Sequence, residues 1–396
     1  MLSLNTFQRL GVILALIIDC SCECPKAKFT NATTDFGFKL LRSSFANTNE
    51  NMNVVLSPTG VSTLLAIVYS GAGGKTAEEL STLLNYTDSE LNRIEAVLAC
   101  QRNILDDPQN NSTAFDVADV ILVRSNVTIL QNYRKTVLTD FATEIVGVNF
   151  EKAGAKVVSD TNDLVAERTS GKITNIIGGE LGADDQMVLL NAAYFNGSLK
   201  MPSTTSYSAQ LPFYTEGIHL TSAETIVCTG PMLYTSETGL NSQVVELPHT
   251  DGRHSLGIVL PHTKRGLSNL THAMDARSFA EMRKNLKPVT VSLTLPRFNF
   301  TTTWDLAGPL IRLGAASLFS DADLTGITSD KGLRVTEMRH KARIEVTEER
   351  AVSPGGGAIA APKAVPVFFH ARHPFLFYVL DHRTQRTILV GLVQQL

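Results

Sequence analysis

The 396-residue chain has only five cysteines, a single tryptophan and no large excess of charge of either sign. Its 35 Lys and Arg residues nearly balance 38 Asp and Glu residues, giving a formal net charge of −3 at pH 7. This balance argues against a general nucleic-acid-binding protein, which needs a basic surface. No apolar run approaches the roughly 18 residues that cross a bilayer, so no membrane association is expected.

The longest apolar run lies at the N-terminus and is typical of a secretory signal peptide. Arg9 precedes Leu10–Ile18 (LGVILALII), and small residues follow at Cys20, Ser21 and Cys22. A buried N-terminal helix is the alternative, but the run is short and uncapped. We expect residues 1–22 to be a signal peptide and residues 23–396 to be the mature, extracellular chain.

Two further patterns bear on secretion. Asn-x-Ser/Thr sequences, which accept N-linked glycans, occur at Asn31, Asn85, Asn110, Asn111, Asn126, Asn196, Asn269 and Asn299. Asn110 and Asn111 overlap, so we expect only one of them to be modified. After cleavage Cys24, Cys100 and Cys228 remain, an odd set that allows at most one disulfide or buried free thiols.

The order of predicted elements indicates a mixed α+β architecture in one continuous domain. No repeat or long linker divides the chain. Helices are predicted at 36–45, at 58–69, at 76–84 with Thr76 and Glu79 as a capping box, and at 304–313. Strands are predicted at 187–195, 243–247, 255–260, 289–295, 342–346, 364–369, 375–380 and 387–392.

No pattern predicts an enzyme, a metal site or a bound cofactor. A Gly-x-Ser-x-Gly nucleophile elbow is absent, and nothing around the nine histidines indicates a catalytic triad. His249, His254 and His262 lack the spacing of metal ligands and are expected to be solvated loop residues. Gly73–Thr76 resembles the end of a phosphate-binding loop, but Tyr69 stands where that loop needs glycine.

The segment 350–366 (RAVSPGGGAIAAPKAVP) differs in composition from everything around it. It is too rich in small residues, Gly and Pro to bury much apolar surface, so we expect an exposed loop that proteases can cut. Pro362 and Pro366 disfavour helix around Lys363. An extended backbone with one cation suits the acidic specificity pocket of a trypsin-like protease, although any exposed lysine in a loop looks similar.

Several sequence blocks together resemble the serpin family over nearly the whole mature chain. They are Asn53–Ser62 (NVVLSPTGVS), Gly71–Glu79 (GAGGKTAEE), Leu189–Gly197 (LLNAAYFNG), Pro296–Phe298, Leu324–Ile327 (LTGI), His340 and Lys341 before Glu348 and Glu349, Phe369–Phe377 (FHARHPFLF) and Leu389–Leu392 (LVGL). The resemblance implies a single large domain with three sheets, about nine helices and an exposed reactive loop.

The resemblance also implies a suicide mechanism. A serine protease cuts the loop, and the loop then inserts into the main sheet as a central strand and distorts the attached protease. Counting back from His373–Phe375 places the scissile bond at Lys363 and Ala364, whereas counting forward from Glu348 places it one residue later. We choose Lys363 because its side chain fits a specific pocket. The reactive-loop segment is 348–366, and its inserting hinge consists of Glu348, Glu349, Arg350, Ala351, Val352, Ser353, Pro354, Gly355, Gly356 and Gly357.

Some positions depart from the family pattern. The hinge has Pro354 and three glycines where the family has small residues such as Thr and Ala, and Leu164 and Leu199 stand where it has Trp. Pro in a central strand and ordering of the glycines oppose insertion by about 3 to 6 kcal/mol. The alternative function is therefore a non-inhibitory binding or carrier protein whose loop is cut as a substrate. In either case we expect a monomer.

Four polar residues match the family's sheet-opening region: Ser57, Ser62, Asn191 and His340. We expect a buried hydrogen-bond cluster that holds the main sheet closed yet able to part. Ordinary satisfied core polar groups are the other interpretation.

Overall fold

The computed structural model describes residues 24–45, 52–87, 90–105, 114–179, 181–201, 206–349 and 365–396. In these ranges the helices are α1 (Lys26–Phe45), α2 (Pro58–Tyr69), α3 (Gly74–Leu83), α4 (Ile94–Leu105), α5 (Gln131–Phe141), α6 (Phe150–Arg168), α7 (Leu267–Ala273), α8 (Ala276–Lys284), α9 (Ala307–Arg312) and α10 (Ala316–Phe319). The strands are β1 (Val54–Leu56), β2 (Phe115–Arg124), β3 (Ile145–Val148), β4 (Met187–Lys200), β5 (Tyr207–Thr215), β6 (His219–Glu237), β7 (Ser242–Pro248), β8 (His254–Pro261), β9 (Lys287–Pro296), β10 (Phe298–Asp305), β11 (Val335–Glu349), β12 (Val367–His370), β13 (Phe375–Asp381) and β14 (Arg386–Val393). The fold is a single mixed α+β domain, as predicted.

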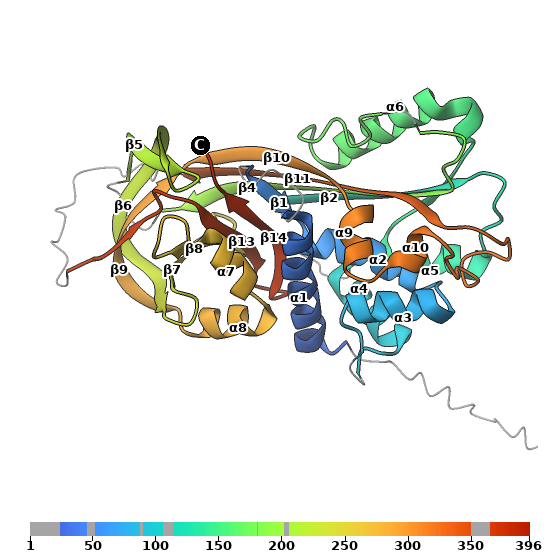
Figure 1. Cartoon of the computed structure of the whole chain (residues 1–396), viewed down its shortest axis with the longest axis horizontal. Helices are drawn as coiled ribbons and strands as arrows, with labels where there is room; N and C mark the ends of the chain where they lie inside the picture. The colour runs from blue at the N-terminus through green and yellow to red at the C-terminus, as the bar shows by residue number, and fades with distance from the viewer. Residues whose placement is uncertain are drawn as a thin grey trace, which may run out of the picture.

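A five-stranded sheet in the order β10-β11-β4-β2-β3 extends along the length of the molecule. Its centre is a long parallel pair, in which β11 lies beside β4 from Val335 opposite Met187 to Glu349 opposite Lys200. Figure 1 shows α6 over one face of this sheet and α2 and α9 on the other side. We call the α6 side the outer face and the α2 side the inner face.

A second sheet of nine strands has the order β1-β14-β13-β8-β7-β6-β9-β12, with β5 also paired to β6. The 19-residue β6 pairs with β5 near its start and with β7 near its end. Two of the three expected sheets are therefore continuous through β6, and hydrogen bonding gives two sheets in the described part of the chain.

Helix α2 begins and ends where the sequence predicts. Pro58 occupies the first turn, and the Ser57 side chain caps the helix by accepting a 3.1 Å hydrogen bond from the Gly60 N–H. Most of its residues are buried between α1, β4 and β14. The helix therefore brings Ser57 to the inner face of the five-stranded sheet.

The predicted capping box at Thr76 and Glu79 is wrong. Helix α3 starts at Gly74, and its N-cap residue Gly73 makes no side-chain cap. The Thr76 hydroxyl instead accepts a 3.0 Å hydrogen bond from the Asp323 N–H and lies within hydrogen-bond distance, 3.1 Å, of the Ser317 hydroxyl. Glu79 accepts two more hydrogen bonds from Ser317. Thr76 and Glu79 thus bind residues that are distant in sequence, in place of the N–H groups at the start of α3.

The helix predicted from Trp304 is also wrong at its start. Trp304 lies in β10, where its indole N–H donates a 2.9 Å hydrogen bond to the Val55 carbonyl, and α9 begins only at Ala307. The prediction of helices first and strands later also missed β1, β2 and β3 in the first half of the chain. Sequence periodicity did not reveal these strands because tertiary pairing stabilises them.

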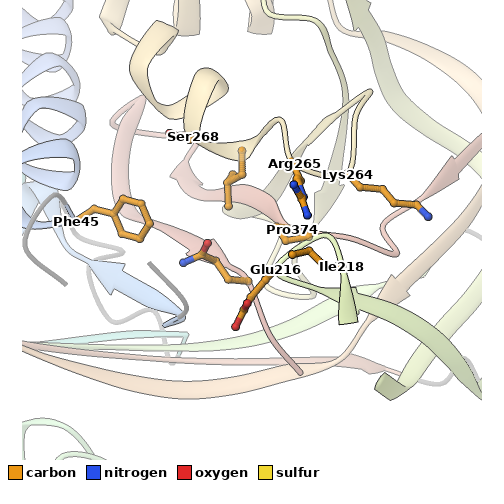
Figure 2. Close-up of a pocket in the computed structure, with 9 residues that line it drawn as sticks. Phe45, Glu216, Ile218, Lys264, Arg265, Ser268 and Pro374 are labelled. Atoms are coloured by element: carbon orange, nitrogen blue, oxygen red, sulfur yellow. The ribbon is translucent and has the colours of Figure 1, made fainter. Parts of the chain in front are cut away.

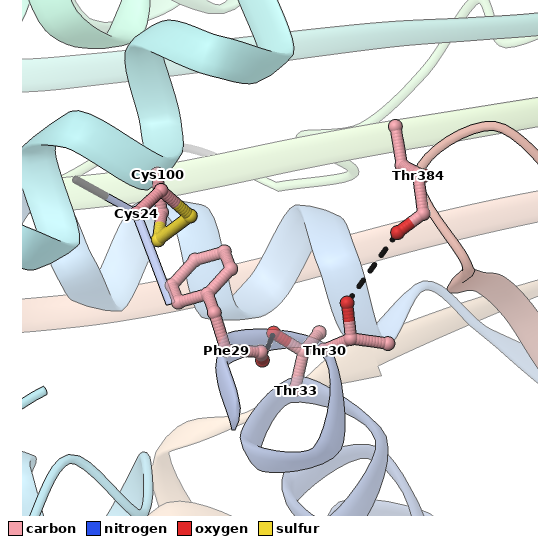
Figure 3. The surroundings of a disulfide bond; sticks show 6 residues. All are labelled: Cys24, Phe29, Thr30, Thr33, Cys100 and Thr384. Carbon is pink, nitrogen blue, oxygen red and sulfur yellow. Dashed lines mark hydrogen bonds between the residues drawn. A yellow bond between two sulfur atoms is a disulfide. The ribbon is translucent and has the colours of Figure 1, made fainter. Parts of the chain in front are cut away.

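A disulfide between Cys24 and Cys100 joins the residues just before α1 to α4, and Cys228 is a buried free thiol. This confirms the expectation of at most one bridge among these three cysteines. Figure 3 shows Phe29 beside the bridge and Thr30 on the side facing Thr384, to whose carbonyl the Thr30 hydroxyl donates. No described helix is long and apolar enough to cross a membrane.

Candidate functional site

The candidate site is the boundary between β4 and β11, which we call the seam. β11 ends at Glu349, and after the reactive-loop residues the chain continues into β12, which pairs with β9 in the other sheet. The predicted scissile residues Lys363 and Ala364 lie outside the described residues, as do the hinge residues from Arg350 to Gly357. The structure therefore describes where the loop departs and returns.

Glu348, a predicted hinge residue, forms an ion pair at the C-terminal end of β11, where the reactive loop departs. Its side chain is only 4% exposed and accepts hydrogen bonds from two nitrogens of Arg297, which lies between β9 and β10. Arg297 also pairs with Glu224 of β6. Hydrogen bonding to Glu348 and the charges of both carboxylates raise the pKa of Arg297. This pair links the end of β11 to the second sheet.

Three of the four predicted sheet-opening residues meet on the inner face of the seam. The Ser57 backbone N–H donates a 2.9 Å hydrogen bond to His340 Nε2, and His340 Nδ1 lies 3.2 Å from the Asn191 carbonyl oxygen. Nε2 thus accepts and Nδ1 donates, as in a neutral imidazole. Burial lowers the pKa of His340 to about 4, which keeps it neutral at pH 7. The ring bridges β11, β4 and the start of α2.

Ser62 does not take part in this network. Its hydroxyl donates a 3.0 Å hydrogen bond to the Thr59 carbonyl within α2. The Asn191 side chain instead donates a 2.6 Å hydrogen bond to Asp119 of β2, a residue that the sequence did not indicate. Burial of this carboxyl group raises the pKa of Asp119 to about 6. A Cβ at Gly60 would meet the Asn191 amide at 2.4 Å, so glycine permits this close packing.

The expectation that His249 and His254 are solvated is wrong. Both are buried, 5% and 2% exposed, and both rings contact Phe195, whereas His262 is exposed. Asp251 accepts a 2.6 Å hydrogen bond from His254, and its own N–H donates to His249 Nδ1. The β7–β8 turn folds these residues back onto β4, which sequence spacing could not indicate. The described residues contain no metal-binding cluster of His, Cys, Asp and Glu.

The described glycan acceptors are all accessible. Asn31, Asn85, Asn126, Asn196, Asn269 and Asn299 are exposed, while Asn110 and Asn111 lie outside the described residues. The predicted signal peptide, residues 1–22, also lies outside them.

A pocket of about 300 Å³ lies between the end of α1, the β5–β6 turn and the start of α7. Figure 2 shows Phe45 on one side of it and Lys264 and Arg265 on the other. Lys264 Nζ lies 3.3 Å from the centroid of the Tyr214 ring. None of the predicted site residues that the structure describes lines this pocket, and we assign it no part in the seam.

Comparison with known proteins agrees with this architecture. The family model described as Serpin (serine protease inhibitor) matches residues 31–396. Iripin-2 of Ixodes ricinus is 30% identical over 396 residues and is matched over 98% of each chain. Intracellular coagulation inhibitor 1 of Tachypleus tridentatus is 29% identical, over 93% of this chain and 89% of that protein. The solved structure of Serpin48 of Tenebrio molitor has a TM-score of 0.80 at 27% identity, covering 93% of this chain and 98% of that one. The chain belongs to the serpin family.

Proposed function

We propose that this protein is a secreted, monomeric suicide inhibitor of a trypsin-like serine protease, not an enzyme, and that it needs no cofactor. The protease attacks the bond between Lys363 and Ala364, and the hinge from Glu348 to Gly357 then enters the seam before the acyl-enzyme is hydrolysed. Relatives named as a coagulation inhibitor and a leukocyte elastase inhibitor support protease inhibition as the general activity.

The observation that carries the proposal is the parallel pairing of β4 and β11 directly beside the point where the loop departs. A hinge that turns back from Glu349 would run antiparallel to β11. Placed between β4 and β11, it would be antiparallel to both strands. Insertion there replaces one parallel ladder with two antiparallel ladders, which are slightly more stable per residue. Placed between β10 and β11 it would be parallel to β10, so the seam is the favoured entry.

Secretion is supported by two features of the described residues. The Cys24–Cys100 disulfide belongs to an oxidising compartment such as the secretory pathway. Six glycan acceptors lie on the exposed surface. Two relatives are named intracellular coagulation inhibitors, so secretion of this chain needs its own test. Glycosidase treatment of protein secreted by cultured cells should reduce its apparent mass, and retention inside the cells would contradict this part of the proposal.

The hinge composition favours the alternative that the loop is cut without inserting. Pro354 and the three following glycines slow insertion relative to deacylation, which determines whether the protease is trapped or released. Incubation with trypsin followed by a denaturing gel distinguishes the two. A covalent complex, together with higher heat stability of the cleaved protein, supports inhibition. Cleavage without a complex or added stability supports a non-inhibitory carrier.

A further inference from the structure

The outer face of the seam carries a second polar contact between β4 and β11. The Tyr194 hydroxyl of β4 donates a 3.0 Å hydrogen bond to Glu345 of β11. In the register of the two strands, Tyr194 lies opposite Arg343, so the bond reaches diagonally across the seam to the next outward-facing residue. The Tyr194 ring is buried among the apolar side chains that pack beneath α6. This hydrogen bond and the His340–Asn191 bond thus cross the same seam on opposite faces.

Glu345 is held in place by two cations. Arg343 donates a 2.6 Å hydrogen bond to it, and Lys172 Nζ lies 3.3 Å from its Oε2 atom. The Lys172 ammonium also lies 5.4 Å from the centroid of the Tyr194 ring. Burial opposes ionisation of Glu345, but hydrogen bonds from Tyr194 and Lys172 and the nearby positive charges outweigh it and lower its pKa. The carboxylate therefore stays charged and is a strong acceptor for the Tyr194 hydroxyl.

The segment that follows α6, the helix over the outer face, also makes hydrogen bonds to β11. Lys172 belongs to this segment, and Arg343 donates a 3.3 Å hydrogen bond to its carbonyl. Lys341 donates to the Asn175 carbonyl of the segment. These contacts attach β11 to the segment after α6. Beyond the backbone ladder, the side chain of Glu345 is joined to β4 by the hydrogen bond from Tyr194.

Separating the strands breaks the bond from Tyr194. Adjacent strands lie about 4.8 Å apart, so one inserted strand would move β4 and β11 to roughly 9.6 Å apart. The Tyr194 hydroxyl could then no longer reach Glu345. The contacts of Glu345 with Arg343, on the same strand, do not cross the seam and need not break.

We propose that Tyr194 and Glu345 form an outer latch, a pair of positioning residues that limits how often the seam opens. The inference deepens the proposed function, on which its role in inhibition rests, but opening of the seam can be measured without any insertion. Hydrogen exchange of the backbone amides of β4 and β11 in the intact protein reports that opening directly.

The test compares Tyr194→Phe, which removes only the hydroxyl, with Tyr207→Phe on the exposed strand β5 as a matched control. We expect amides of β4 and β11 to exchange about tenfold faster in Tyr194→Phe, a change of about 1.4 kcal/mol. Amides of β13 and β14 should exchange as in the unaltered protein, which separates a local latch from general destabilisation. Glu345→Gln, which keeps an acceptor without its charge, should show a smaller increase.

A second measurement relates the latch to inhibition. In Tyr194→Phe, fewer moles of protein should be needed to trap one mole of trypsin, while the rate of initial loop cleavage should not change. Unchanged exchange in β4 and β11, or equal acceleration in β13 and β14, overturns the latch. Faster exchange of the seam without any trapped trypsin in either protein retains the latch and contradicts the inhibitory function instead.

Discussion

His340 accepts a hydrogen bond from the backbone of Ser57 at 2.9 Å, although 283 positions separate the two residues in sequence. The bond requires an unprotonated Nε2 atom, since a protonated ring could not accept it. The inner face of the seam therefore depends on a neutral histidine, and this dependence leads to a prediction about pH.

Two groups on the inner face should respond to acid in opposite directions. Burial lowers the pKa of His340 from 6.5 to about 4, so the stability that its neutral form provides is complete above pH 6.5 and lost as pH falls toward 4. Burial raises the pKa of Asp119 from 3.8 to about 6, so the cost of its buried charge is present above pH 6 and relieved as pH falls toward 4. The two effects largely cancel in the unaltered protein.

Asp119→Asn should expose the contribution of His340. We expect its free energy of unfolding to fall by up to about 3 kcal/mol relative to the unaltered protein between pH 6.5 and 4. Denaturant unfolding at a series of pH values measures this difference. Adding His340→Gln to Asp119→Asn should remove the extra pH dependence. If the free energies of unfolding of Asp119→Asn and of the unaltered protein change with pH in parallel, Asp119 and His340 do not oppose each other.

Lys363→Ala should abolish cleavage of the reactive loop by trypsin, because only a basic side chain fills the acidic specificity pocket. Arg350→Ala is the matched control, since it removes the other basic residue of the loop outside the predicted scissile bond. Mass spectrometry of the fragments locates the cut. Loss of cleavage in Arg350→Ala, with full cleavage in Lys363→Ala, would place the scissile bond elsewhere.

Pro354→Ala should increase the fraction of trypsin that is trapped. A proline inside a central strand leaves a ladder hydrogen bond unmade, and a cost of about 3 kcal/mol, as for a proline inside a helix, would slow insertion by about 10² relative to deacylation. Titrating trypsin with each protein gives the number of inhibitor molecules consumed per trapped protease. Pro362→Ala, near the scissile bond but beyond the hinge, serves as the comparison. If as many molecules of the Pro354→Ala variant as of the unaltered protein are consumed per trapped trypsin, the missing N–H group does not limit insertion.

Removing the disulfide should destabilise the whole domain. Cys24 and Cys100 are 76 positions apart, so the bond restricts a long loop of the unfolded chain. We expect Cys24→Ser with Cys100→Ser to lower the free energy of unfolding by about 4 kcal/mol. Denaturant unfolding with and without a reductant measures it. The reductant should destabilise only the protein that keeps both cysteines. An effect of the reductant on the double variant would mean that another disulfide contributes to stability.

Features set by local chemistry were predictable. Pro58 after a capping serine defines the start of α2, and the apolar runs of β8, β13 and β14 identify buried strands without knowledge of their partners. Predictions failed where a distant contact replaced a local one. Thr76 bonds to residues near α10 in place of its own helix, and His249 is folded onto β4.

The sequence by itself determined the family pattern, because the matching blocks are fixed by residue type and order along the chain. Resemblance to that pattern then predicted Lys363 as the bait and grouped Ser57, Asn191 and His340, which meet in the structure. Only the tertiary structure decided that Asn191 reaches Asp119 and that Tyr194 reaches Glu345, 151 positions away. The reason is physical: side chains of β4 face those of its neighbours β2 and β11 because of strand register, and register is set by packing of the whole sheet.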